Sequence, residues 1–493
     1  MHRRALIESA PALSPTLAPR GELIDRALAR VSDAELRLGN RLVLLRDGRE
    51  TYVDWLTAIA GAQRWVHLEN YIFLDDKVGH LFADALAERA AAGVPVRVLV
   101  DWFGSMSVGR SFWKRLRGEG VEVRIVNPPA AGTPLQSFKR DHRKLLAVDG
   151  SYGSVGGVCI GEKWLERSPV TDLPFRDTAV SVRGPAVAEL ERAFASMWDL
   201  QGDPLPAEER PRPEEIPVAG DEAARVIIQD PGRLQILRVL QLLAAGIERR
   251  FWIADAYFLS VPSLTESLLA AARDGVDVRV LLPSTSDIPL IGPLSRAGYR
   301  PLLEAGVRIW EYSGLMMHAK TSVADGWWSR VGSTNLNIAG LWMNWEIDLV
   351  VEDRRFAAEM EAMFLEDLAE AREIRLHPGR RRPRVHPERP RTRAERQAQR
   401  KIRRPGQRTA ASLARLGGAA FGGGEESLRR HERMIEAAVS GSVLGLSLLG
   451  AGFPRLLAWP IAVVGGVVGA AGVVRVLRPP EPRKSAVPAA LTP

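Results

Sequence analysis

Two short segments of the chain carry the same set of reactive residues. The pattern H-x-K-x4-D-G occurs at His142–Gly150 and again at His318–Gly326. Composition alone predicts roughly 0.006 matches to H-x-K-x4-D, so two matches are not accidental. Side chains two residues apart share one face of a strand, so each histidine is expected beside its lysine. Asp149 and Asp325 have the opposite parity and precede Gly, a turn signal, so we expect them to be structural or to support the site from behind.

Paired histidines and lysines indicate chemistry on an anion. A metal site is one alternative, but a lysine beside each histidine would repel a cation. Lysines suit phosphate instead. If the two segments meet, one histidine can attack phosphorus while the other protonates the leaving alkoxide. We therefore expect phosphohistidine catalysis without metal, nucleotide or other cofactor. The alternative is a pair of histidines with structural roles only.

A longer repeat surrounds the two motifs. Trp65–Phe73 is followed by a helical pattern and by Ala91–Val100, and the same order recurs as Phe251–Phe258, a helical pattern and Arg273–Leu282. Apolar strands that alternate with helices of roughly 10 to 18 residues are typical of βαβ units with buried strands. The sequence therefore predicts an α/β fold with a duplicated domain and an acidic, proline-rich linker near Pro204–Glu222.

The paired motifs resemble those of the phospholipase D superfamily, and the surrounding sequence resembles bacterial cardiolipin synthases. The resemblance covers about residues 39–370, with these further matching segments: Gly39–Gly48, Tyr71–Asp75, Gly93–Asp101, Arg176-Asp177 with Gly184-Pro185, and Asn344–Glu346. It implies pseudo-symmetric tandem repeats, each a sheet flanked by helices, with one active site at their interface. The implied reaction joins phosphatidylglycerol with a second phosphatidylglycerol, another phospholipid or a glycerol-type alcohol, and makes cardiolipin.

The resemblance also assigns roles to the motif residues. His142 and His318 are the nucleophile and the general acid/base, with His142 favoured as the nucleophile. Lys144 and Lys320 bind the phosphoryl oxygens.

Further site residues follow each motif. By the same resemblance, Ser333 and Asn335 supply hydrogen bonds to phosphate, and Gly157 occupies the matching stretch of the first copy. Cys159 stands where the family pattern has Asn, which replaces strong hydrogen-bond donors by a weak one. We expect Cys159 to be a small buried apolar residue and not a nucleophile.

Two acidic residues resemble those that hold the second nitrogen of each histidine. They are Asp177 and Glu346, which follow later in each repeat. Such a contact fixes the tautomer and raises the basicity of the imidazole. The alternative is an ordinary charge at the end of a strand.

Three functions are compatible with these residues: phosphatidyl transfer between lipids, hydrolysis of a phosphodiester by water, and a membrane protein that has lost catalysis through the change at Cys159. The distribution of charge along the chain bears on the second of these functions, hydrolysis of a phosphodiester. The chain has a formal net charge of +8, but 372–408 hold 15 basic and 3 acidic residues, and the rest holds 52 and 56. A near-neutral body argues against a nuclease, so no nucleic-acid partner is expected.

The C-terminal region predicts membrane association. No charged residue lies within 437–454 or 456–474, and each stretch is near the roughly 17 to 25 residues that span a bilayer. A membrane-associated hairpin over 437–474 is favoured over a buried helix pair. Basic residues on both sides predict a cytoplasmic body on the inner membrane of a bacterium, facing anionic lipid. The N-terminus has no secretory signal, and a single cysteine excludes an intrachain disulfide.

The predicted divisions of the chain follow from these features. They are an extension at 1–38, a first repeat at 39–205, a linker at 206–222, a second repeat at 223–371, a basic Pro/Arg-rich linker with a helical segment at 372–436, the hairpin at 437–474 and a tail at 475–493.

Overall fold

The computed structural model describes residues 22–376, apart from 129–138, 166–173, 289–290 and 314–315. The predicted hairpin and tail, and the predicted basic linker beyond residue 376, lie outside the described residues; the first residues of that linker instead belong to an edge strand at Ala371–Ile374. Of the helices within the described ranges, none combines the length and the apolar character needed to cross a bilayer.

The first half contains seven strands and four helices in βαβ order. The strands are β1 (Arg37–Arg46), β2 (Val66–Asn70), β3 (Val96–Asp101), β4 (Glu122–Val126), β5 (Lys144–Val148), β6 (Tyr152–Gly156) and β7 (Thr178–Arg183). The helices are α2 (Asp47–Ala60), α3 (Lys77–Ala91), α4 (Arg110–Gly118) and α5 (Val187–Leu200). Across the sheet the strands run β1-β7-β6-β5-β2-β3-β4, with β2, β3 and β4 parallel.

The second half repeats this arrangement and adds one edge strand. Its strands are β8 (Glu222–Gln229), β9 (Arg250–Ala254), β10 (Asp277–Pro283), β11 (Arg308–Tyr312), β12 (Thr321–Ala324), β13 (Trp328–Gly332), β14 (Glu346–Val351) and β15 (Ala371–Ile374). Its helices are α6 (Gln235–Gly246), α7 (Pro262–Arg273), α8 (Ile291–Ala297), α9 (Tyr299–Ala305) and α10 (Arg354–Ala369). The order β8-β14-β13-β12-β9-β10-β11 matches the first half strand for strand. The predicted duplication of an α/β domain is therefore confirmed.

The halves join edge to edge, which the sequence did not predict. β1 pairs antiparallel with β8, with Arg37 opposite Ala224 and Asn40 opposite Glu222. This pairing makes one sheet of 15 strands where two separate sheets were expected. Each half thereby covers the edge strand of the other and removes an exposed row of unpaired backbone groups.

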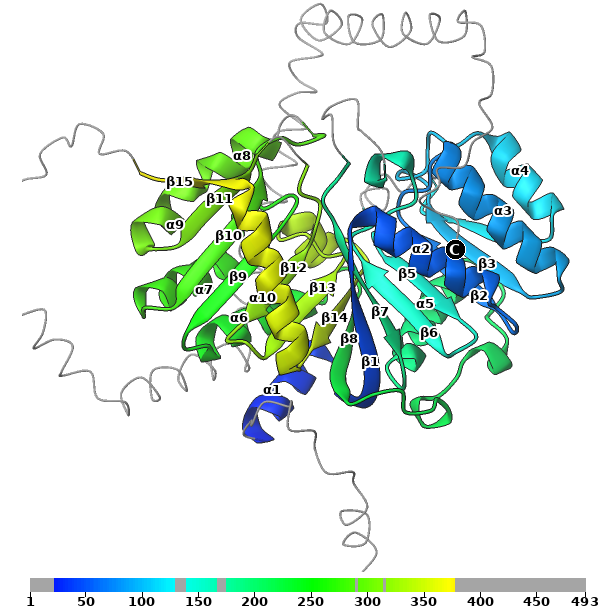
Figure 1. Ribbon diagram of the computed structural model, residues 1–493, viewed down its shortest axis with the longest axis horizontal. Coiled ribbons are helices and arrows are strands. Elements are labelled where there is room, and N and C mark those ends of the chain that lie inside the picture. Colours follow the sequence, from blue (N-terminus) through cyan, green and yellow to red (C-terminus); the bar gives the residue numbers. More distant parts are fainter. Residues whose placement is uncertain (1–21, 129–138, 166–173, 289–290, 314–315, 377–493) are drawn as a thin grey trace, which may run out of the picture. The chain divides into compact units, whose positions relative to one another are not determined.

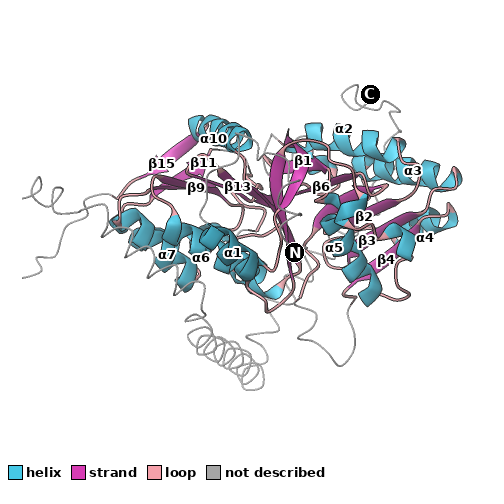
Figure 2. Ribbon diagram, turned by 90° about the horizontal axis from the view of Figure 1, so that it is seen from below, coloured by secondary structure: helices cyan, strands magenta, loops and turns pink. Residues whose placement is uncertain are grey.

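Helices cover both faces of the sheet, as Figure 2 shows, with α2, α3 and α10 on one side and α6 and α7 on the other. Aspartate side chains start two of these helices: Asp76 accepts a hydrogen bond from the Gly79 amide, and Asp353 accepts from the amides of Arg355 and Phe356. Such caps satisfy amides that have no partner within the helix.

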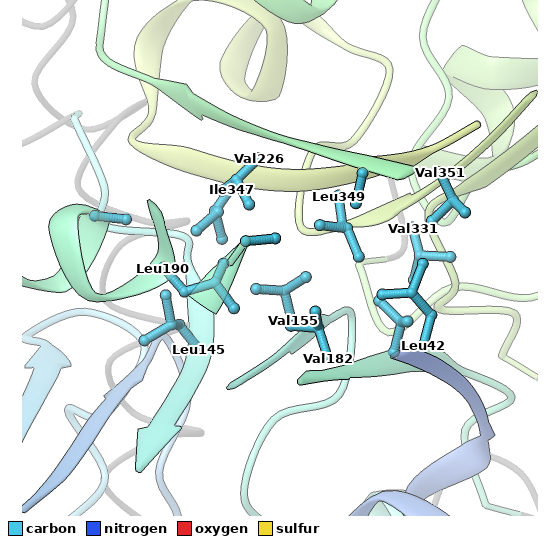
Figure 3. Packing of buried hydrophobic residues seen from close by; sticks show 14 of the residues in the cluster. Leu42, Leu145, Val155, Val182, Leu190, Val226, Val331, Ile347, Leu349 and Val351 are labelled. Atoms are coloured by element: carbon cyan, nitrogen blue, oxygen red, sulfur yellow. The ribbon is translucent and has the colours of Figure 1, made fainter. Parts of the chain in front are cut away.

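A shared apolar core connects the two halves. Leu145, Val155 and Val182 of the first half lie near Ile347 and Leu349 of the second (Figure 3). All five are buried. Burial of each such side chain contributes about 1.5–3 kcal/mol, so separation of the halves would be costly. The core therefore keeps the ends of β5 and β12 at fixed positions relative to each other.

The segments outside the repeats also contribute to packing. In the predicted N-terminal extension, α1 (Glu22–Ser32) packs against α6 of the second half, with Leu28 and Val31 buried. In the predicted linker, Glu209 is buried, and its carboxylate contacts His67 Nε2 at 2.8 Å and the Arg97 guanidinium. The linker is thus anchored to the sheet of the first half.

Candidate active site

The first motif lies where β5 begins. His142 precedes this strand, and its backbone amide donates to the Trp345 carbonyl of the second half at 3.0 Å. Lys144 is the first residue of β5 and is opposite Asn70 at the end of β2. The imidazole is 7% exposed and the lysine is fully buried. The motif is therefore held from both halves at once.

The second motif has the same setting with the halves exchanged. The backbone amide of His318 donates to the Arg176 carbonyl of the first half, and Met317 forms an isolated bridge with Arg176. His318 is 4% exposed and Lys320 is fully buried. Each histidine is thus anchored to the residue that precedes a carboxylate of the opposite half.

The two carboxylates contact the histidines across the joint between the halves. His142 Nδ1 lies 2.9 Å from Glu346 Oε2, and His318 Nδ1 lies 2.7 Å from Asp177 Oδ2. A carboxylate that accepts from Nδ1–H leaves Nε2 free to attack or to carry a proton. The sequence predicted a carboxylate for each histidine; the structure shows that the partner comes from the other repeat.

The surroundings of the two carboxylates differ. Asp177 also accepts from Trp164 Nε1 and from the Thr178 amide, both at 2.8 Å. Burial by itself raises the pKa of Asp177, but His318, Lys320 and the hydrogen bond from the Thr178 amide outweigh it and hold this pKa below its usual value. In contrast, burial raises the pKa of Glu346 to about 8, against the opposing effect of Lys144. At neutral pH, Asp177 is ionised and Glu346 is largely protonated.

Both histidines are neutral in the free site. Burial and repulsion from Lys144 and Lys320 lower the pKa of His142 well below its ordinary value. Burial and Lys320 lower the pKa of His318 to about 4, although Asp177 opposes this. A neutral imidazole has the free lone pair that a nucleophile needs. His318, beside an ionised carboxylate, is the easier of the two to protonate when an anionic substrate arrives.

The lysine ammonium groups approach backbone and aromatic groups beside the histidines. Lys144 Nζ donates to the His142 carbonyl at 2.6 Å and lies 4.9 Å from the centre of the Tyr71 ring. Lys320 Nζ donates to the His318 carbonyl and lies 5.8 Å from the Tyr257 ring. Burial lowers the pKa of Lys320 to about 8. These cations can hold phosphoryl oxygens next to the Nε2 atoms.

The predicted phosphate-binding residues divide into two groups. The Ser333 hydroxyl donates to Glu346 and accepts from the Ile347 amide at 2.9 Å, so it supports the carboxylate of His142. A Cβ at Gly157 would lie 2.1 Å from Asp177 Oδ1, so only glycine fits against this carboxylate. Both residues thus contact a carboxylate, and their role as phosphate ligands stays a prediction. Asn335 is buried, and within the described part of the chain its Oδ1 has no partner.

Cys159 is fully buried, and its Sγ contacts the Gly157 carbonyl only at 4.0 Å. Burial raises the pKa of its thiol. A protonated, inaccessible thiol is a poor nucleophile.

The motif aspartates lie at the opposite ends of their strands from the histidines. Asp149 accepts from the amides of Gln63, Arg64 and Trp65 at 2.7–3.0 Å. Asp325 likewise accepts from three successive amides, at 248–250. Both adopt positive φ angles, 57° and 48°, in the turn after the strand. Of the two expected roles, the structural one fits this position, and direct support of the histidines does not.

Sequence reasoning missed three residues of the site. The rings of Tyr71 and Tyr257 lie 4.7 and 5.9 Å from those of His142 and His318. Their recurrence after each repeated strand was the available signal. Asn70 is 1% exposed, and both polar atoms of its amide lack a partner within the described residues. No motif marked Asn70, since only the strand pairing places it beside Lys144.

The described residues contain no group of three or more His, Cys, Asp or Glu side chains that could hold a metal ion. What the site does contain is two imidazoles with free Nε2 atoms and two buried ammonium groups. This set can displace an alcohol from a phosphodiester through a covalent intermediate.

Comparisons with known proteins agree with this geometry. The family model described as a cardiolipin synthase, phospholipase D-like domain matches residues 55–198 and 241–368. A cardiolipin synthase of Geobacillus sp. is 31% identical over 349 residues, 70% of this chain and 69% of the relative. Cardiolipin synthase A of Pseudomonas fluorescens is 33% identical over 359 residues, 71% of this chain and 73% of the relative. A crystal structure of phosphatidylserine synthase from Haemophilus influenzae superposes with a TM-score of 0.55 at 14% identity, covering 80% of this chain and 99% of that one, and so shares the fold.

Proposed function

The chain belongs to the cardiolipin synthase family of phospholipase D-like proteins, and we propose that it is a phosphatidyltransferase that makes cardiolipin through a phosphohistidine. The observation that carries this proposal is the crossed pairing of each motif histidine with a carboxylate of the other half. Neither half can complete a site alone, and the joined halves present one nucleophile and one acid.

In the first half-reaction, His142 Nε2 attacks phosphorus of phosphatidylglycerol. His318 takes up a proton on Nε2 when the anionic substrate binds; the bond from phosphorus to the glycerol oxygen then breaks, His318 Nε2 gives that oxygen its proton, and glycerol leaves. Lys144 and Lys320 neutralise the phosphoryl oxygens as charge develops. His142 is the nucleophile in this proposal because its partner Glu346 is largely neutral, whereas the ionised Asp177 favours the protonated form of His318.

In the second half-reaction, neutral His318 takes the proton from the hydroxyl of a second phosphatidylglycerol. That oxygen attacks phosphorus, the bond from phosphorus to His142 Nε2 breaks, and cardiolipin is released. Both imidazoles are less than a tenth exposed. A site with this little access to solvent favours a lipid hydroxyl over water as the acceptor.

We include Asn70 in the phosphate cradle. It is directly opposite Lys144, so the two side chains share one face of the sheet. Its unpartnered amide can donate to a phosphoryl oxygen there. Asn70 thereby gives the first half a side-chain amide, which Cys159 does not provide, and Asn335 gives one to the second half.

We further propose that the enzyme acts on the bacterial inner membrane with its body on the cytoplasmic side. The support is the apolar composition of 437–474 with basic residues on both flanks. The near-neutral body supports lipid over nucleic acid as the partner.

The test is phospholipid composition, by mass spectrometry, in cardiolipin-deficient cells that express the chain. Cardiolipin is expected with the parent and absent with His142→Ala and with His318→Ala at equal expression. Phosphatidic acid in place of cardiolipin would refute transfer and favour hydrolysis. No lipid change with well-expressed protein would refute both.

A further inference from the structure

Exposed apolar side chains occur at equivalent places in the two halves. Phe103 and Met106 follow β3 and are 53% and 61% exposed. Ile288 follows β10 and Leu294 lies in α8, 48% and 47% exposed. We call these four residues the apolar rim. Large apolar side chains on a surface are common singly, but matched pairs in the segments that follow corresponding strands call for a reason.

Printed contacts tie both parts of the rim to the active site. β3 is parallel to β2, whose last residue is opposite Lys144, so the loop after β3 begins at the catalytic end of the sheet. Phe103 lies 5.3 Å from the guanidinium of Arg140, two residues before His142. In the second half, Asp287 accepts from the Tyr257 hydroxyl at 2.6 Å, and the Tyr257 ring contacts that of His318.

The arrangement in space agrees with these contacts. The helices that follow the two loops, α4 and α8, both lie toward the upper edge of Figure 1, whereas α1 lies at the lower edge. Val218, 73% exposed, marks the opposite end, because the amide of the next residue, Ala219, donates to the Gly39 carbonyl at 2.9 Å near the start of β1.

Charge near the rim is basic on the side of the first half. Lys139 and Arg110 are exposed there, and α4 has no acidic residue in its first turn. Near the second half, the charges of Arg296 and Glu311 are paired at 2.7 Å, and the exposed Asp287 beside Ile288 adds an acidic group, so the basic charge is confined to the first-half side of the rim. An apolar surface flanked by basic residues fits an anionic lipid surface.

We propose that the apolar rim inserts into the bilayer around the active site, so that phospholipid reaches His142 and His318 without crossing water. This inference rests on the proposed function, because a lipid substrate is what gives the catalytic end of the sheet a reason to contact a bilayer. The occupant is the lipid surface; a second copy of the chain on the same residues is the competing outcome.

The first test places an environment-sensitive fluorophore on single cysteines in the full chain, at Met106→Cys, Ile288→Cys and the control Val218→Cys. Cys159 is fully buried and is not expected to be labelled. With phosphatidylglycerol vesicles, labels at 106 and 288 should shift to the blue and be quenched at least threefold by phospholipid brominated in its acyl chains. The label at 218 should do neither. Equal behaviour at all three positions would overturn the proposal, as would a blue shift that appears without lipid and grows with protein concentration.

The second test separates the rim from the chemistry. The double variant Met106→Ser/Ile288→Ser should transfer at least tenfold more slowly on vesicles, but within twofold of the parent on short-chain phosphatidylglycerol dispersed as monomers. Val218→Ser should match the parent on both. Equal losses on both substrates would overturn the rim proposal. A parent inactive on both would refute the proposed function, while the fluorophores would still report whether the rim enters lipid.

Discussion

The unequal settings of the two histidines predict unequal responses to a change of leaving group. If His318 protonates the leaving oxygen, its role becomes dispensable when the substrate carries an acidic phenol that leaves as an anion. His318→Ala should therefore still release nitrophenolate from phosphatidyl-p-nitrophenol in a burst of one equivalent per site. His142→Ala should release none, because the nucleophile is absent.

The structure also gives the expected loss of activity when Asp177, the carboxylate that contacts His318 Nδ1, is removed. With a pKa of about 4, roughly one free site in a thousand has His318 protonated at pH 7. Loss of an opposite charge at contact distance shifts a pKa by about 1–3 units. Asp177→Asn should therefore slow transfer from phosphatidylglycerol by roughly 10- to 1,000-fold, with little change in the nitrophenolate burst. Glu346→Gln is the matched control: with a pKa of about 8, this carboxyl is roughly nine-tenths neutral at pH 7, so a loss below about tenfold is expected.

The assay is stopped-flow absorbance of nitrophenolate beside mass spectrometry of cardiolipin, on purified full-length protein. A burst with His142→Ala and none with His318→Ala would refute the assignment and exchange the two roles. Equal losses of Asp177→Asn on both substrates would show that Asp177 acts through folding and not through proton transfer.

Four further predictions concern the phosphate cradle, pH and stability. Asn70→Ala should lower kcat/KM about 10- to 150-fold, as expected for one lost hydrogen bond to a charged group, while an unchanged kcat/KM would remove Asn70 from the cradle. Cys159→Asn, measured in the same transfer assay, should raise kcat/KM by no more than about twofold, since Asn70 already supplies an amide; a larger gain would contradict this. The free-site pKa of Lys320 is about 8. Above that pH, kcat/KM should fall about tenfold per pH unit, because the ammonium group loses its proton. In pH profiles this alkaline decrease should persist in Glu346→Gln but vanish in Lys320→Met. Asp325→Ala removes three charge-assisted hydrogen bonds from backbone amides. In urea titrations it should lower the free energy of unfolding by about 3–5 kcal/mol, while activity per folded molecule is retained. A urea midpoint equal to that of the parent would refute the structural role.

The local features of the chain were predictable because they depend on neighbours in sequence. The strand and helix periods of the repeats, the turn at Asp149-Gly150 and the alternation that puts His142 beside Lys144 follow from short-range backbone geometry. The duplication followed from self-similarity, and with it the expectation of one site between two halves. The uncharged stretches within 437–474 could also be recognised from composition. The hairpin that they suggest remains a prediction.

The partners of the site residues were not predictable, because they are set by how the halves join. Pairing of β1 with β8 and the shared core bring Glu346 to His142 and Asp177 to His318, across about 140 to 200 residues of chain. The same packing turns Ser333 toward Glu346 and, among the residues that the structure describes, leaves the Asn70 amide without a partner beside Lys144. Residue type and local period decide which groups are available for phosphoryl chemistry, and both can be taken from the sequence. The tertiary structure alone decided which carboxylate serves which histidine, because burial and hydrogen bonding across the joint set the charge of each group.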